Sequence, residues 1–314
     1  MTPAAQAGSA AHAVAGGYKV AATIPVGGAP LGVAAYPRAH SVYVANSASG
    51  TVSVISARTN TVVATIPVYG SPHWIAVNRR TGTVYVTSYT SNLVSVISAR
   101  TNTVVAMIPV GHAPAGIAVN QRTNRIYVAN NNWPTHGSVS VINGHTNLVR
   151  ATIGVKGNLY SVAVNDRTNT IYADGYNGPM SVINGQTNKV VATIRVPTSA
   201  FAISLNPLTS TVYSTNYWDD TMTVIDARTN TVKATVRAGT WPQGDAVDPR
   251  TGTVYVADQE ADAVAVIDGQ TNQVVATVAV GADPYGLALY RHARAIYVTN
   301  QDANTVSVIT ASQP

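Results

Sequence analysis

The 314-residue sequence contains no cysteine, and charged residues make up only 10% of it. The absence of cysteine excludes disulfide bonds and thiolate chemistry. No apolar run approaches the roughly 18 residues that a membrane helix needs. The N-terminus also lacks the basic segment and sustained apolar core of a signal peptide. We therefore expect a soluble chain with no membrane partner, either cytoplasmic or exported with its signal already removed.

Several chemical motifs are missing as well. The sequence has no HxH, HExxH or CxxC spacing, no phosphate loop, no dinucleotide fingerprint and no Ser-His-Asp arrangement. We therefore expect no cofactor, with a divalent metal held by acidic loops such as NYWDDT as the weaker alternative. Lys and Arg exceed Asp and Glu by 19 to 13. A charge balance this small does not indicate nucleic acid, and we expect none to bind.

What the sequence has in abundance is a repeat with a tyrosine in its core. The repeat tyrosines are Tyr43, Tyr85, Tyr127, Tyr172, Tyr213, Tyr255 and Tyr297. Their spacing of 41 to 45 residues, with several short runs rich in Val, Ile, Tyr and Thr in each period, is typical of propeller blades. The sequence thus predicts an all-β fold, a seven-bladed β-propeller.

Each period contains four short β-rich runs separated by polar turns, which predicts four antiparallel strands per blade. Pro25, Pro67 and Pro109 fall in the fourth run. Proline removes a hydrogen-bond donor from the ladder, so this run should be the outer edge strand. The second and third runs are apolar at successive positions, as expected for sheets packed on both faces.

The two ends of the chain should meet in the last blade. Residues 20–26 match the outer-strand run at 62–68, while the final repeat supplies only three strands. The N-terminal strand should therefore close the last blade. We expect one propeller domain over residues 18–314, a disordered tail over residues 1–17, and a monomer.

The elements YVAN, YVTS, YVTN and RTNTVVATIPVG closely resemble the YVTN family of seven-bladed β-propellers over about residues 18–310. The resemblance implies the propeller fold. It also implies a scaffold whose members include surface-layer and exported proteins, and so it indicates no particular substrate.

Comparison of the repeats with one another shows where blade building does not explain a residue. Asp245 stands at an inner-strand position that holds a branched aliphatic residue in the other six blades. A carboxylate there costs stability unless it is paired or neutral, and such exceptions are expected at functional sites. We expect Asp245 to be a catalytic acid or base with His73 as its counterpart. The alternative is a structural carboxylate that accepts hydrogen bonds from loop amides or from Tyr285.

The loops at one end of the predicted channel, which we call the top face, collect aromatic and acidic residues. Nine of the thirteen carboxylates are expected there: Asp174, Asp219, Asp220, Asp245, Asp258, Glu260, Asp262, Asp283 and Asp302. The predicted ligand-binding residues are Trp74, Tyr89, Trp133, His136, Tyr160, Tyr176, Phe201, Tyr217, Trp218, Trp241, Gln243, Asp258 and Tyr285. Such a face favours a cationic or aromatic organic ligand. The opposite turns carry most of the arginines, which we interpret as a solvated face.

Two functions follow from these residues. The first is a small-molecule site at the top of the channel that performs acid/base chemistry of the lyase, cyclase or hydrolase kind. The second is a non-catalytic propeller that presents a face to a protein or cell-envelope partner. A deep pocket holding Asp245 and His73 would favour the first, and a plugged top face the second.

Overall fold

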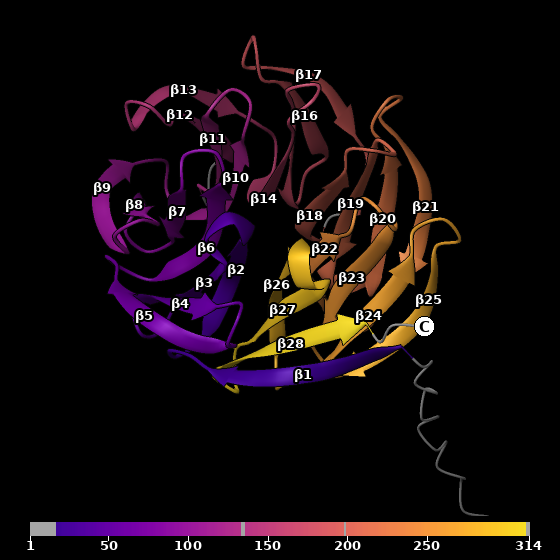
Figure 1. The fold of residues 1–314 in the computed structure, drawn as a ribbon. Coiled ribbons are helices and arrows are strands. Elements are labelled where there is room, and N and C mark those ends of the chain that lie inside the picture. Colours follow the sequence, from indigo (N-terminus) through magenta and orange to yellow (C-terminus); the bar gives the residue numbers. More distant parts are fainter. Residues whose placement is uncertain (1–16, 133–135, 198, 312–314) are drawn as a thin grey trace, which may run out of the picture.

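A computed structural model describes residues 17–132, 136–197 and 199–311 of the chain. The described residues form seven four-stranded antiparallel sheets arranged around a central axis (Figure 1). The predicted all-β, seven-bladed propeller with four antiparallel strands per blade is confirmed. The expected tail over residues 1–17 lies, apart from Gly17, outside the described residues.

The inner strand of each blade lies next to the channel, and the sheet then continues outward in chain order. Blade one consists of β2 (Pro30–Tyr36), β3 (Ser41–Asn46), β4 (Thr51–Ser56) and β5 (Thr61–Pro67). Blade two consists of β6 (Pro72–Asn78), β7 (Thr83–Ser88), β8 (Leu93–Ser98) and β9 (Thr103–Pro109). Blade three consists of β10 (Pro114–Asn120), β11 (Arg125–Asn130), β12 (Ser138–Asn143) and β13 (Leu148–Gly154). Blade four consists of β14 (Asn158–Asn165), β15 (Thr170–Tyr176), β16 (Met180–Asn184) and β17 (Lys189–Ile194).

The remaining blades follow the same order, and three short 3₁₀ helices lie in turns. Blade five consists of β18 (Ala200–Asn206), β19 (Thr211–Asn216), β20 (Thr221–Asp226) and β21 (Thr231–Arg237). Blade six consists of β22 (Pro242–Val247), β23 (Thr253–Asp258), β24 (Ala263–Asp268) and β25 (Gln273–Ala279). Blade seven consists of β26 (Pro284–Tyr290), β27 (Ala295–Asn300), β28 (Thr305–Ala311) and β1 (Tyr18–Pro25). The 3₁₀ helices are η1 (Pro37–Ala39), η2 (Tyr217–Asp219) and η3 (Arg291–Ala293).

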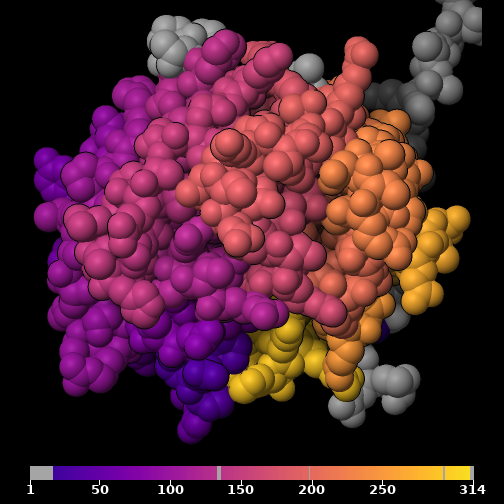
Figure 2. Space-filling view, turned by 90° about the horizontal axis from the view of Figure 1, so that it is seen from above, coloured from indigo at the N-terminus to yellow at the C-terminus, as the bar shows by residue number. Residues whose placement is uncertain are grey.

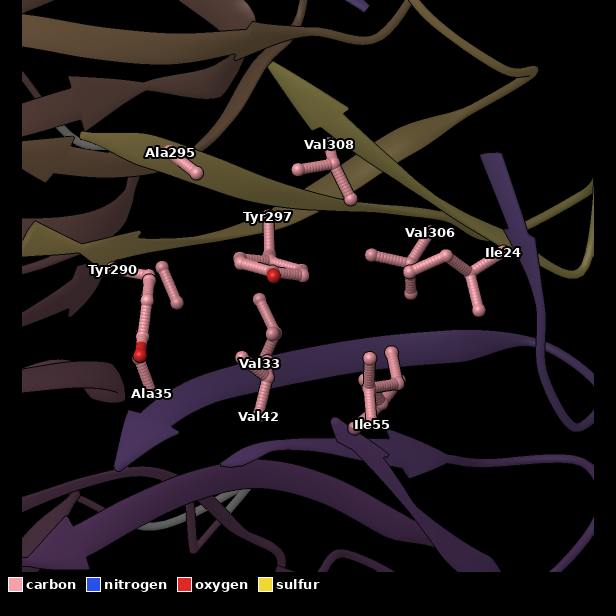
Figure 3. Packing of buried hydrophobic residues seen from close by; sticks show 12 residues of the cluster. Ile24, Val33, Ala35, Val42, Ile55, Tyr290, Ala295, Tyr297, Val306 and Val308 are labelled. Carbon is pink, nitrogen blue, oxygen red and sulfur yellow. The ribbon is translucent and has the colours of Figure 1, made fainter. Parts of the chain in front are cut away.

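The N-terminal strand closes the ring, as the sequence predicts. Strand β1 pairs antiparallel with β28, with Tyr18 opposite Ala311 and Pro25 opposite Thr305. In Figure 1, β1 runs along the outside of β28 at the lower edge of the ring. Ile24 on β1 packs with Val306 and Val308 of blade seven and with Ile55 of blade one (Figure 3). The first strand therefore holds blades one and seven together.

Apolar packing between neighbouring sheets fills the body of the ring. On the side of the ring that Figure 2 shows, the colours pass from purple at the left to orange at the right, so neighbouring blades follow in sequence order. Six of the seven repeat tyrosines are among the largest fully buried side chains. The hydroxyl of Tyr297 donates to Asn60 Oδ1 at 2.9 Å, from blade seven to a turn of blade one. The repeat residues therefore serve contacts between blades, which explains why they recur.

The inner strands approach one another closely near the top of the channel. A Cβ added at Gly32 would lie 2.7 Å from the His73 carbonyl oxygen and 2.8 Å from the Trp74 Cα. This close approach explains why small residues occupy that position in six blades. One extra residue bulges the inner strand at the same level, as between Pro242 and Asp245. Such bulges re-aim the side chains that follow.

Candidate functional site

The side chains at the top ends of the inner strands fill the channel mouth. We call His73, Tyr160, Phe201, Gln243 and Tyr285 the plug. His73, Phe201, Gln243 and Tyr285 are buried, while Tyr160 is half-buried. Phe201 packs edge-on to Tyr285, with ring centroids 5.3 Å apart. The predicted mouth residues Phe201 and Tyr285 are thus brought together, and they form one apolar cluster with Tyr160.

Three polar groups of the plug bond to each other. The Tyr160 hydroxyl lies 3.1 Å from His73 Nε2 and 2.8 Å from the Tyr285 hydroxyl. The Tyr285 hydroxyl in turn lies 3.3 Å from His73 Nε2. Burial lowers the pKa of His73 to about 4 and raises the pKa values of both tyrosines, Tyr285 well above its usual range. All three groups are therefore uncharged at neutral pH.

An aromatic stack leads from the plug to the surface over blades five and six. Phe201 stacks on Tyr217 with centroids 5.9 Å apart, and Tyr217 stacks on Trp241 at 6.0 Å and 19°. Trp218 meets the Tyr217 ring edge-on at 4.6 Å. Trp218 is 66% exposed and Trp241 is 38% exposed. We call Tyr217, Trp218 and Trp241 the aromatic surface, because these rings offer faces and edges to an incoming ligand.

Two further predicted tyrosines extend the plug on the side of blades two and four. The Tyr89 ring lies 5.5 Å from His73, and the Tyr176 ring lies 5.8 Å from Tyr160. Both tyrosines are half-buried. Trp74 is half-buried as well and packs against Tyr285 with centroids 5.8 Å apart. The rings of Trp74, Tyr89 and Tyr176 therefore pack mainly against the plug, and each has only part of its surface exposed.

Several acidic residues of the top face hold the loops in place. Asp220 Oδ1 accepts the Trp241 amide at 3.1 Å, and Asp262 Oδ1 accepts the Asp283 amide at 2.9 Å. Asn304 makes the same contact with the amide of Ala29 at 2.8 Å. The two carboxylates therefore accept the same loop hydrogen bond that an uncharged asparagine accepts between other blades. This backbone contact does not require their negative charge, and Asp220 also forms an ion pair, since its Oδ2 lies 3.8 Å from an Arg237 guanidinium nitrogen.

Asp258 and Gln243 also have structural partners at the top face. Asp258 Oδ1 accepts the Thr240 amide at 2.9 Å, and burial is the main cause of its raised pKa. Gln243 Nε2 donates to Gln259 Oε1 at 2.5 Å, whereas Gln243 Oε1 is buried without a partner. Both residues lie beside the aromatic surface on blade six, and a ligand-binding role for them stays a prediction.

Asp245 lies in the channel, two residues further along β22 than the plug residue Gln243. Its Oδ2 accepts a hydrogen bond from the Ser204 hydroxyl at 2.5 Å, while Oδ1 is buried and has no hydrogen-bond partner. Burial raises the pKa of Asp245 to about 7, and the Ser204 bond and nearby amides lower it only in part. Asp245 makes no hydrogen bond to His73, whose partners are Tyr160 and Tyr285. The structure therefore places the two predicted catalytic residues in separate hydrogen-bond groups.

A second buried carboxyl group shares the features of Asp245. Asp174 was expected on the top face, but it is only 1% exposed and lies between blades four and five. Its Oδ2 accepts from the Ser214 hydroxyl at 3.1 Å and its Oδ1 from the Gly175 amide at 2.9 Å. Burial raises its pKa to about 7. The expectation failed because the side chain turns between two sheets, a direction that the repeat pattern does not give.

The serine partners of Asp245 and Asp174 could have been found in the sequence by comparing exceptions between adjacent repeats. Ser204 replaces an alanine of the other six blades, and Ser214 replaces a valine or alanine. Each serine of blade five bonds to a carboxyl group that is itself an exception, in blade six and blade four respectively. Paired exceptions in adjacent repeats would have identified both contacts.

Of the long loop in blade three, the structure describes residues 130–132 and 136–138. Trp133 lies outside the described residues. His136 is exposed and makes no ring contact with the plug, although its carbonyl oxygen accepts from Asn132 Nδ2 at 3.4 Å. Within residues 17–132, 136–197 and 199–311, no group of three or more His, Asp or Glu side chains is arranged to hold a metal ion. The same residues contain no helix that is long and apolar enough to cross a membrane.

Comparison with known proteins supports the fold and leaves the site open. The model of the YNCE-like beta-propeller family matches residues 12–125. No curated protein matches the chain. The structure is similar to Kuenenia stuttgartiensis hydrazine synthase, with a TM-score of 0.79 and 19% identity over 89% of this chain and 95% of that one. Identity this low shows a shared propeller fold alone. The family match and the seven blades agree with the resemblance to YVTN-type repeat propellers.

Proposed function

We propose that this propeller binds a small cationic or aromatic molecule on the aromatic surface of Tyr217, Trp218 and Trp241. The observation that carries the proposal is the exposed ring of Trp241, which stacks on Tyr217 with centroids 6.0 Å apart. Its φ of 54° lies in the left-handed region, as it does at the equivalent loop positions Ala29, Ala113 and Asp283. The repeat therefore sets the backbone there, and what distinguishes blade six is the large aromatic side chain.

Charge around the aromatic surface favours a cation. Glu260 and Asp283 are close enough to Tyr217 to contribute to its raised pKa, after burial as the main cause. Asp219 and Glu260 are exposed. A cation over a tryptophan or tyrosine face is stabilised by about 0.5–2 kcal/mol, and neighbouring carboxylates add to that attraction. A quaternary ammonium group on an aromatic ring matches both features.

The proposal is one of binding. The plug separates the aromatic surface from Asp245, and His73 is buried with its Nε2 already engaged by two tyrosines. Acid/base chemistry of the lyase, cyclase or hydrolase kind would require a substrate to reach Asp245 within the channel. A ligand on the aromatic surface does not meet that requirement.

Titration with benzyltrimethylammonium, followed by tryptophan fluorescence, tests the proposal. Trp241→Ala and Trp218→Ala should each weaken binding by roughly tenfold, the equivalent of about 1.4 kcal/mol. Tyr69→Ala is the matched control, because Tyr69 is 64% exposed and makes no ring contact with the aromatic surface. Equal losses in all three variants, or no saturable binding to the wild type, would contradict the proposal.

A protein partner on the same face is the second candidate, and the filled channel mouth favours it. A plugged face with two exposed tryptophans suits a contact with another protein, since tryptophan is enriched at interface hot spots. Native mass spectrometry of the protein isolated from the cells that make it separates the two candidates. A bound small molecule lost in Trp241→Ala supports the first, and a bound protein lost in Trp218→Ala supports the second.

A further inference from the structure

Two adjoining cavities occupy the channel beneath the plug. The upper one, of about 280 Å³, contains Asp245 and reaches up to Trp74. The lower one, of about 310 Å³, extends to Arg79 and Arg291. They share Val33, Ser204, Leu205 and Leu287 in their walls. Apart from Asp245 and a few serines, the walls between these ends are mainly Val, Leu, Ile and Ala.

The lower end of this space carries two arginines without carboxylate partners. Arg79 follows β6 and Arg291 follows β26, so both stand where an inner strand leaves the channel. Neither guanidinium makes an ion pair or a hydrogen bond to the described residues. Arg79 is exposed overall, yet its pKa is lowered, first by partial burial of the guanidinium and second by the charge of Arg291. Asp166 offsets this only in part, so the lower mouth remains positive.

The upper end of the space holds a hydrogen-bond acceptor, the carboxyl group of Asp245. Oδ1 of Asp245 is buried and unpaired, and a buried acceptor without a donor is a group that a ligand can satisfy. Pro249 occupies in blade six the position of Arg79 and Arg291 and follows Asp245 by four residues, the first two of which belong to β22. That separation is at most about 13 Å along the channel axis. A cationic mouth and a buried acceptor thus stand at opposite ends of a passage whose lining residues are mainly aliphatic and whose exposed wall surface is largely polar.

We propose that the channel is a second ligand site, entered from the face opposite the plug, for a slender linear carboxylate with a hydrogen-bond donor at its far end. The carboxylate contacts Arg79 and Arg291 at the mouth. The alkyl chain lies along Val33, Leu205 and Leu287, and the terminal hydroxyl or ammonium group donates to Asp245 Oδ1. This site is separate from the aromatic surface, because the plug stands between the two.

Isothermal titration calorimetry with 8-hydroxyoctanoate, 8-aminooctanoate and octanoate at pH 8 tests the proposal. At least one of the two donor-bearing probes should bind the wild type about tenfold or more tightly than octanoate, because octanoate leaves Asp245 without a donor. In Asp245→Val this preference should vanish. The valine restores the residue type of the other blades, so the variant is expected to fold.

Charge variants test the mouth independently. Arg79→Gln and Arg291→Gln should each lower the affinity for the more tightly bound donor-bearing probe by about tenfold, since each substitution removes a charge-assisted hydrogen bond. Arg58→Gln removes an exposed arginine from a turn away from the channel and should leave the affinity unchanged. Trp241→Ala should leave it unchanged too, which distinguishes this site from the aromatic surface.

Three results would each overturn the proposal. One is the absence of saturable binding by any of the three probes. The second is wild-type affinity for octanoate equal to that for both donor-bearing probes. The third is an equal effect of Arg79→Gln, Arg291→Gln and Arg58→Gln, which would indicate attraction by net charge alone.

Discussion

The hydroxyl of Ser204 donates a 2.5 Å hydrogen bond to Oδ2 of Asp245, and this bond joins the inner strands of blades five and six. Both residues depart from the repeat, since alanine and a branched aliphatic residue occupy their positions in the other six blades. Each exception explains the other, because a buried carboxyl group needs a donor and a buried hydroxyl needs an acceptor.

The first prediction concerns this pair. Ser204→Ala alone should destabilise the protein by about 1–3 kcal/mol, since it removes the one side-chain donor to Asp245. Ser204→Ala combined with Asp245→Val should be more stable than the wild type, because apolar groups then replace both buried polar groups. Urea unfolding of the wild type, both single variants and the double variant measures this coupling. Additive effects of the two substitutions would show that the bond has no energetic role.

The second prediction concerns pH. Burial raises the pKa of Asp245 to about 7, against about 3.9 in an unfolded chain. The folded state therefore binds the proton more tightly, and the stability that this group contributes is present below about pH 4 and is lost as pH rises through 7. Asp245→Val should accordingly raise the melting temperature more at pH 8 than at pH 5, by the equivalent of about 2 kcal/mol. Asp302→Asn, which alters an exposed carboxylate, is the control and should show no comparable difference.

The third prediction concerns closure of the ring. Removing residues 1–17 leaves β1 intact and should change the melting temperature little. Removing residues 1–26 deletes the strand that pairs with β28, together with the buried Ile24. We expect a loss of more than about 3 kcal/mol or a failure to fold, measured by thermal unfolding of both truncated proteins. Equal stability of the two would mean that β1 does not hold the last blade.

The fourth prediction concerns the electrostatics of the aromatic surface. Binding of benzyltrimethylammonium should weaken as salt rises from about 0.02 M to 1 M, because the screening length falls to about 3 Å at 1 M. Benzyl alcohol has no charge and should show a much smaller dependence. Fluorescence titrations at several salt concentrations provide the comparison. If the affinities of the two probes depended equally on salt, the carboxylates would not contribute to binding at the proposed site.

The sequence by itself determined the architecture, because a propeller repeats one local pattern. The spacing of residues such as Tyr43 and Tyr85 gave the number of blades, and Pro67 at the end of β5 marked the outer strand. The match between residues 20–26 and 62–68 gave the closure. Each of these features depends on strand propensity, hydrogen-bond donors and turn chemistry within a single repeat, all of which can be read along the chain.

Only the tertiary structure decided the arrangement of the site. Asp245 is an exception to the repeat, and His73 stands at a position that varies from blade to blade. His73 bonds to Tyr160, whereas Asp245 bonds to Ser204. Asp174 turns between two sheets and not toward the top face. These outcomes depend on the direction of each side chain and on contacts between blades, about 40 residues or more apart in the chain. A repeat pattern shows that a residue is unusual, but the packing of neighbouring blades determines which partner it meets.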